Sequence, residues 1–124
     1  MEKKKVLTID DDPLIQRLFG GRLAKAGFDV VYAHNGLEGR EMARKYKPDL
    51  IIIDIHMPGN EDGLQTAMRL KTEDETKEIP ISLLSSADLS FEAEKTASDM
   101  GIHYIHKGIE EEEFVKNIKK WMKE

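Results

Sequence analysis

The chain of 124 residues contains no cysteine and no apolar run of the length that a membrane-spanning helix requires. The absence of cysteine excludes a disulfide framework and a thiolate metal site, and it suits a reducing compartment. The lysines near the N-terminus are not followed by the apolar core of a secretion signal. We therefore expect a soluble, cytoplasmic protein that has no contact with membranes.

An excess of positive charge is also lacking. The 19 Lys and Arg residues face 24 Asp and Glu residues, which gives a formal net charge of −5. This balance argues against direct binding to the phosphate backbone of a nucleic acid, and the cluster Lys3 to Lys5 is too short to reverse it. The length predicts one domain over residues 1–124 with a single sizeable core.

Apolar runs and helical patterns alternate along the whole chain. Strands are predicted at 6–9, 28–33, 50–53, 79–84 and 102–105, and helices at about 14–23, 37–46, 64–70, 88–100 and 114–122. Gly27 and Gly101 are expected to stop the first and fourth helices, and Pro48 to end the second. Five strand-then-helix units with short connections predict a doubly wound α/β domain, in which helices cover both faces of an open parallel sheet.

Two adjacent glycines interrupt the first predicted helix. Each of Gly20 and Gly21 costs about 1 kcal/mol relative to alanine in a helix interior. The sequence offers no reason for either of them.

Polar side chains collect where the predicted strands end. They are Asp10, Asp11 and Asp12 after the first strand, Asp54 after the third, Ser85 and Ser86 after the fourth, and Lys107 after the fifth. The carboxyl ends of parallel strands form one edge, where open α/β sheets bind their ligands. Carboxylates gathered there repel one another unless some are protonated or a cation lies among them. Oxygen ligands without cysteine favour Mg²⁺, with Mn²⁺ or Ca²⁺ as alternatives.

Asp54 directly follows the isoleucines 51–53, and its position points to a chemical role. A carboxylate can act as a nucleophile and form an aspartyl phosphate, which requires that it be held rigidly. The buried strand would supply this rigidity, and the turn at 57–59 would leave one face open. Lys107 and Ser85 could then neutralise and hydrogen-bond a phosphoryl group.

The segments VLTIDDDP, PDLIIIDIHMPGNEDG, IPISLLSSAD and IHYIHKG occur in this order and together span nearly the whole chain. They resemble the motifs of two-component response regulator receiver domains, of the single-domain kind seen in chemotaxis response regulators. The resemblance implies a flavodoxin-like receiver fold, with a five-stranded parallel sheet in the order 2-1-3-4-5 flanked by five helices.

The same resemblance implies roles for the residues at the sheet edge. Asp54 matches the phospho-acceptor, and Asp10 and Asp11 match the acidic pair that binds Mg²⁺, or Mn²⁺, together with Asp54 and the backbone carbonyl of His56. Ser85 and Lys107 match the hydroxyl and lysine that contact the phosphoryl group. Tyr104 matches the aromatic switch residue, whose ring turns inward when the hydroxyl moves.

The implied function is a phosphorylation-controlled signalling module. It would take its phosphoryl group from the phosphohistidine of a sensor histidine kinase or a histidine phosphotransfer protein. It would not be an enzyme beyond its own phosphotransfer and dephosphorylation. A downstream protein would bind the face of the fourth helix, fifth strand and fifth helix, with the chain as a monomer or a phosphorylation-dependent dimer. We expect output through partner binding, from the chain alone or as the receiver of a longer protein.

The sequence departs from the family pattern in two places. Lys107 is followed by Gly108, where the family usually has a proline, commonly after a cis peptide bond. Because a cis bond before a non-proline residue costs about 2.5 to 4 kcal/mol, this bond is expected to be trans or the loop more mobile. The loop at 57–63 is one residue longer than usual. These departures leave open a degenerate receiver that binds partners without phosphorylation.

Two unrelated classes of protein share part of this pattern, and some of its residues also suit purely structural roles. A flavodoxin-like cofactor carrier needs a phosphate cradle after the first strand, where the three aspartates would repel the phosphate. Phosphatases with an aspartate nucleophile usually have a second acid two residues later, where this chain has His56.

Asp12 is expected to cap the first helix, and in isolation Lys107 could be an ordinary solvated loop residue.

Overall fold

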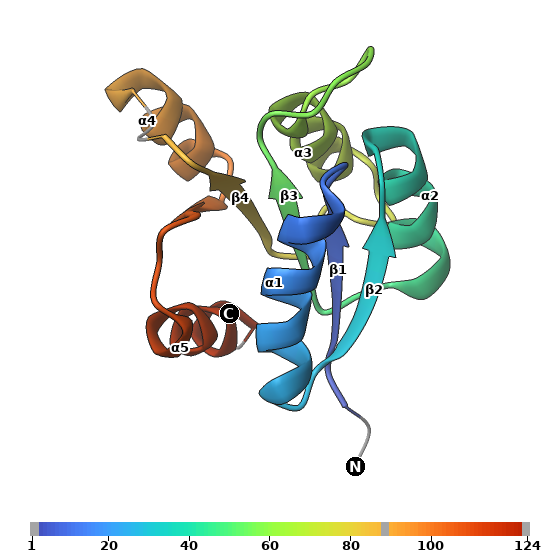
Figure 1. The fold of residues 1–124 in the computed structure, drawn as a ribbon. Helices are drawn as coiled ribbons and strands as arrows, with labels where there is room; N and C mark the ends of the chain where they lie inside the picture. The colour runs from blue at the N-terminus through green and yellow to red at the C-terminus, as the bar shows by residue number, and fades with distance from the viewer. Residues whose placement is uncertain (1–2, 88–89, 123–124) are drawn as a thin grey trace.

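A computed structural model describes residues 3–87 and 90–122 and contains five strands that alternate with five helices (Figure 1). The elements are β1 (Lys5–Ile9), α1 (Pro13–Lys25), β2 (Asp29–Ala33), α2 (Gly36–Tyr46), β3 (Leu50–Asp54), α3 (Gly63–Thr72), β4 (Ile81–Ser85), α4 (Phe91–Asp99), β5 (Ile102–His106) and α5 (Glu111–Met122). All strand pairs are parallel, in the order β2-β1-β3-β4-β5. The predicted fold class and strand order are confirmed.

The sheet has a separate apolar layer on each face. On one face, α1 and α5 contribute Phe19, Leu23, Phe114 and Ile118, which pack on alternate strand residues such as Val6 and Ile52. On the other face, α2, α3 and α4 contribute Ala43, Ala67, Leu70 and Ala97, which pack on Leu7, Ile51 and Leu83. Every residue of β3 is buried, as the uninterrupted apolar strand predicts for a strand covered on both sides.

Local signals in the sequence account for most helix ends. Asp12 caps α1 by accepting a hydrogen bond from the backbone N–H of Leu14 at 2.8 Å. Gly27 and Gly101 have φ angles of +97° and +74°, the left-handed conformation expected at their positions. The predicted start of the fourth helix, Asp88, lies outside the described residues, and α4 begins after Ser90 as its N-cap. None of the helices in the described ranges has the length and apolar character needed to cross a bilayer.

Tertiary packing explains one of the two glycines in α1. Gly20 is buried against the ring of Tyr32 on β2, and a Cβ atom at this position would collide with that ring. Gly21 faces outward, and an added Cβ would have no neighbour within 4 Å. Gly20 therefore gives the Tyr32 ring room to pack against α1, whereas nothing in the structure explains Gly21.

We expect different outcomes when these two glycines are replaced by alanine. Gly21→Ala should raise the free energy of unfolding by about 0.5 to 1 kcal/mol, because alanine costs less conformational entropy in a helix. Gly20→Ala should gain less or destabilise, because the Tyr32 ring must move away. Urea unfolding of the two variants beside the wild type measures the difference, and equal stabilisation by both would contradict the assigned contact.

Candidate functional site

The structure brings four of the predicted site residues to the carboxyl edge of the sheet. Asp10 follows β1, Asp54 and Ser85 end β3 and β4, and Lys107 follows β5. Asp10, Asp54 and Ser85 are only 3%, 3% and 1% exposed. The Lys107 Nζ atom lies 3.3 Å from Asp54 Oδ1, so a cation directly faces the buried carboxylate.

Three carboxylates at this edge could hold a metal ion. Asp10, Asp11 and Asp54 each offer an oxygen atom, and these atoms lie within 4.8 Å of one another. Asp10 Oδ1 accepts a hydrogen bond from the Asp12 N–H at 2.9 Å. Asp10 Oδ2 is buried, and no group in the described ranges hydrogen-bonds to it. A buried oxygen without a partner is costly, and a hard cation that prefers oxygen ligands would satisfy it.

The backbone around Asp54 is tightly constrained. The N–H of His56 donates to Asp54 Oδ1 at 3.1 Å, and the N–H of Gly63 donates to the Ile55 carbonyl at 3.2 Å. A Cβ atom at Gly63 would run into the carbonyl group of Asp54. The first turn of α3 therefore packs directly on the backbone of Asp54, which keeps its carboxylate at the sheet edge. The His56 side chain is exposed.

The electrostatics of the site show most clearly at Asp10. Its burial, together with the nearby charge of Asp54, raises the pKa of Asp10 to about 7, although the Asp12 N–H and the Lys107 ammonium act in the opposite direction. The Asp10 carboxyl therefore resists ionisation when no cation is bound.

Ser85 and Tyr104 are linked through one backbone residue. Ser85 Oγ accepts a hydrogen bond from the N–H of Ala87 at 3.2 Å, and the Tyr104 hydroxyl donates to the carbonyl of the same residue. The structure thus does not place Tyr104 in the acidic cluster, but connects it to Ser85 by way of Ala87.

Gln16 is a site-supporting residue that the sequence analysis missed. Its side chain is 8% exposed, and its amide nitrogen donates to the carbonyls of Ala33 at 2.8 Å and Asp10 at 3.1 Å. It ties the ends of β1 and β2 together next to the acidic cluster. Its spacing of three and seven residues from Phe19 and Leu23, on the buried face of α1, was the available signal.

Comparison with known proteins identifies the family. The sequence pattern of the response regulator receiver domain matches residues 6–119. The chain belongs to the response regulator receiver domain family. It is similar to the polar-differentiation response regulator DivK of Brucella anthropi, with 30% identity over 119 residues and 96% of each chain covered.

Solved structures of other receivers are similar over nearly the whole chain. The chemotaxis protein CheY4 of Vibrio cholerae has a TM-score of 0.88 at 26% identity, covering 97% of this chain and 99% of that one. The BeF3-activated N-terminal receiver domain of RstA from Klebsiella pneumoniae has a TM-score of 0.86 at 29% identity, covering 98% of this chain and 100% of that one. The chain is thus a receiver of two-component response regulators, a class of signalling modules.

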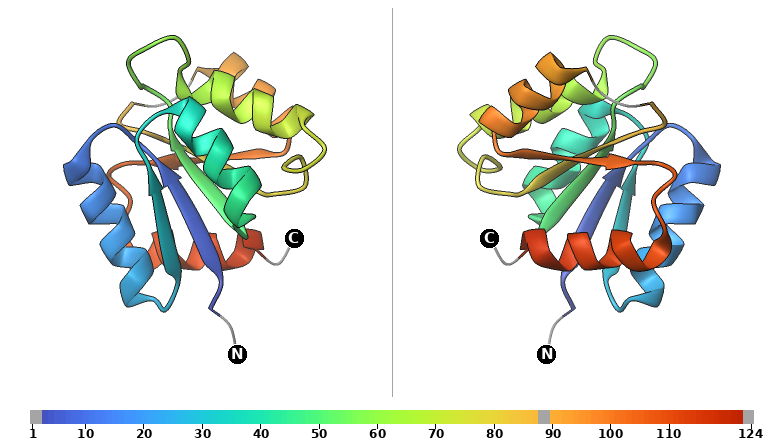
Figure 2. Two further views of the ribbon diagram at one scale, coloured as in Figure 1. Left: turned by 90° about the vertical axis from the view of Figure 1, so that its right-hand side faces the viewer. Right: turned by 90° about the vertical axis from the view of Figure 1, so that its left-hand side faces the viewer.

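Glu61 anchors the loop that follows β3. The loop joins β3 to α3 and rises beyond the sheet in both views of Figure 2. Glu61 accepts two hydrogen bonds from Arg40 of α2, each 3.1 Å long, and one from the Thr66 hydroxyl at 2.6 Å. Arg69 of α3 lies 3.4 Å away from the same carboxylate. The loop that borders Asp54 is therefore tied to α2 and α3.

Burial and pairing act in opposite directions on Glu61. Burial alone would raise its pKa, but the hydrogen bonds from Arg40 and Thr66 and the charges of Arg40 and Arg69 together lower the pKa below its ordinary value. The side chains of Glu61 and Arg40 are each 14% exposed, so solvent screens this pair less than the exposed pairs of the receiver.

Replacing Asp10 should stabilise the metal-free receiver in a pH-dependent way. The pKa of Asp10 is 3.8 in the unfolded reference and about 7 in the fold, so folding loses stability as the pH rises through this interval. In EDTA, Asp10→Asn should raise the free energy of unfolding by on the order of 2 kcal/mol at pH 8, and by much less at pH 5. Asp11→Asn is the control, because Asp11 is the exposed neighbour. If the increase in the free energy of unfolding of Asp10→Asn did not depend on pH, the assigned cost of burying the ionised Asp10 would be contradicted.

Removing the charge of Glu61 should weaken the receiver more than removing a surface charge. Glu61→Gln is expected to cost about 1 to 3 kcal/mol at pH 7, because it breaks a nearly buried, doubly hydrogen-bonded pair. Glu111→Gln, which removes the exposed pair with Lys25, should cost no more than about 1 kcal/mol. Since the pKa of folded Glu61 is lowered, the difference between wild type and Glu61→Gln should shrink as the pH falls below 4.5. Urea unfolding at several pH values measures both effects, and equal costs at the two glutamates would refute the special role of Glu61.

Proposed function

We propose that this receiver is a phosphorylation-controlled module that accepts a phosphoryl group on Asp54. The observation that supports this best is the buried Asp54 carboxylate, with Lys107 Nζ at 3.3 Å and two further acids whose oxygens lie within 4.8 Å. The donor would be the phosphohistidine of a sensor histidine kinase or a histidine phosphotransfer protein, as befits a member of a two-component family.

The proposed transfer is an in-line displacement at phosphorus. An Asp54 carboxylate oxygen forms the new P–O bond while the P–N bond to the donor histidine breaks, and the electron pair leaves with the imidazole. The Lys107 ammonium neutralises charge on the phosphoryl oxygens, and the Ser85 hydroxyl donates a hydrogen bond to one of them. Later attack by water on the same phosphorus returns Asp54 to its carboxylate, so the chain would act on itself and not turn over a separate substrate.

Mg²⁺ is the proposed cofactor, with Mn²⁺ as the alternative. Asp10, Asp11, Asp54 and the backbone carbonyl of His56 would hold it, and the unpartnered Asp10 Oδ2 supports this assignment. When bound, the ion supplies positive charge that stabilises the phosphoryl oxygens. Its charge would also offset the repulsion between the carboxylates at this edge, which would favour the ionised form of Asp10.

The proposed output runs from Ser85 to Tyr104. When the Ser85 hydroxyl turns toward the phosphoryl group, the Ala87 N–H loses its present acceptor. Ala87 can then move, and its hydrogen bond with the Tyr104 hydroxyl changes with it. The face of α4, β5 and α5 would then present a different surface to a downstream protein. Phe91 at the start of α4 is 81% exposed, which supports protein binding there. Action in the cytoplasm, a monomer or phosphorylation-dependent dimer, and output without nucleic-acid contact stay predictions.

Phosphorylation in vitro tests the proposal directly. After incubation with Mg²⁺ and acetyl phosphate, intact mass should show one added phosphoryl group on the wild type and none on Asp54→Asn. EDTA added beforehand should abolish the adduct, because the phosphoryl oxygens of acetyl phosphate need a cation beside Asp54. Asp29→Asn is the matched control, since Asp29 is an exposed acid at the start of β2.

The outcome separates the two functions that the sequence leaves open. An adduct that persists in Asp54→Asn would refute the assigned acceptor. A folded wild type that forms no adduct with either acetyl phosphate or beryllofluoride would favour a phosphorylation-independent binding module. The BeF3-activated state named for the RstA receiver supports the choice of that mimic.

A further inference from the structure

The segment after β5 is ordered without the proline that the family pattern has there. Gly108 follows Lys107, and no cis peptide bond occurs within residues 3–87 and 90–122, so the bond between these two residues is trans. Lys107 must nonetheless hold its ammonium group at Asp54. Its side chain is only 20% exposed, and hydrogen bonds of the neighbouring backbone hold the segment that carries it.

Hydrogen bonds hold three consecutive N–H groups of this segment. The N–H of Lys107 donates to the Ser85 carbonyl at 2.7 Å, and the N–H of Ile109 donates to the His106 carbonyl at 3.0 Å. Between them, the N–H of Gly108 donates to the side chain of His106, with a distance of 2.9 Å to Nδ1. The middle bond depends on a side chain because its acceptor is His106 Nδ1. A proline at position 108 would have no N–H to donate.

His106 and Gly108 are also matched in shape. A Cβ atom at Gly108 would lie 3.0 Å from His106 Nδ1 and 3.2 Å from Cε1, closer than ordinary contacts allow. A larger residue would require the imidazole to shift by a few tenths of an ångström. Glycine at 108 thus provides both the N–H and the space that the ring needs.

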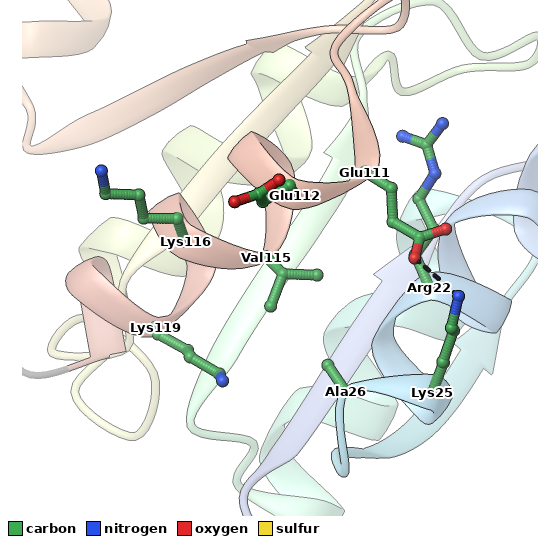
Figure 3. A pocket seen from close by; sticks show the side chains of 8 residues that line it. All are labelled: Arg22, Lys25, Ala26, Glu111, Glu112, Val115, Lys116 and Lys119. Atoms are coloured by element: carbon green, nitrogen blue, oxygen red, sulfur yellow. Dashed lines mark hydrogen bonds and ion pairs between the residues drawn. The ribbon is translucent and has the colours of Figure 1, made fainter.

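Arg22 of α1 holds the other end of the segment. Its Nη1 atom donates to the Ile109 carbonyl at 3.0 Å, and its guanidinium lies 5.0 Å from the ring centre of Phe19 and 6.0 Å from that of Phe114. Figure 3 shows the Arg22 side chain running from α1 alongside the segment that leads into α5. The segment is therefore fixed at Ile109 by α1 and at Gly108 by His106.

We propose that His106 is a positioning residue for Lys107: its imidazole accepts the Gly108 N–H, holds the trans peptide after Lys107, and so keeps the ammonium group at Asp54. This inference rests on the proposed function, because the benefit of a fixed Lys107 is faster attack on phosphorus. His106 itself touches neither Asp54 nor a transferred group. In this receiver, a side-chain hydrogen bond replaces the rigid ring of a proline.

The test compares two replacements of His106 that differ in one property. His106→Leu removes the acceptor, whereas His106→Asn places Oδ1 where Nδ1 lies and retains it. We expect phosphorylation by acetyl phosphate, followed by intact mass with Mg²⁺ present, to be about three- to tenfold slower in His106→Leu, the factor that one ordinary hydrogen bond represents. His106→Asn should react at close to the wild-type rate. Because the His106 side chain is exposed, both variants should fold, which circular dichroism checks.

A second background shows whether the effect passes through Lys107. In a Lys107→Ala receiver, His106→Leu should cause no further slowing, because there is no ammonium group left to position. Equal slowing with and without Lys107 would overturn the inference, as would a wild-type rate in His106→Leu or a slow His106→Asn.

The contact can be tested apart from the reaction. Nitrogen-15 spectra of the imidazole should show the Nε2–H tautomer of His106, since Nδ1 accepts a bond, and the Gly108 amide should be protected from exchange. A protonated Nδ1 in the neutral ring, or a freely exchanging Gly108 amide, would overturn the inference. A wild type that shows the contact but takes no phosphoryl group would instead refute the proposed function.

Discussion

Asp10, Asp54 and Lys107 lie close together at the carboxyl edge of the sheet, and the surrounding fold has to hold them there. Two carboxylates that are 3% exposed are unfavourable beside one another, and the single ammonium group at 3.3 Å compensates for only part of that repulsion. The fold tolerates the arrangement because the strands that carry it are covered on both faces by apolar layers. The stability gained in the core is partly used to hold charges where they do not relax on their own.

Several contacts around the site serve to keep this group in place. Gln16 joins the ends of β1 and β2 beside Asp10, and the Gly63 position lets α3 approach the backbone of Asp54. Two segments at the edge of the site each have an anchor of their own. Glu61 ties the loop after β3 to Arg40, and His106 accepts the N–H of Gly108 after β5. In both places a side chain accepts the hydrogen bonds that hold the segment.

A similarly short connection links the site to the surface. Ala87 donates its N–H to Ser85 and accepts the hydroxyl of Tyr104, so that one peptide segment separates a buried group from a half-buried ring. Ala87 is thus the one residue that lies between these two hydrogen bonds. This geometry supports the proposal that a small chemical event at Asp54 alters the face of α4, β5 and α5.

The order of the elements, the parallel α/β class and the strand ends that carry polar residues can all be predicted from the sequence. These follow from local rules: apolar period, helix stops such as Gly27 and Gly101, and a cap at Asp12. Which distant residues meet depends on tertiary packing. The contact of Gly20 with Tyr32, the bond of Gln16 to Ala33 and the pairing of Glu61 with Arg40 join residues 12 to 21 positions apart across packed elements, and no local pattern specifies such partners. The bond from Gly108 to His106 spans only two residues, but it depends on a side-chain orientation that periodicity does not describe.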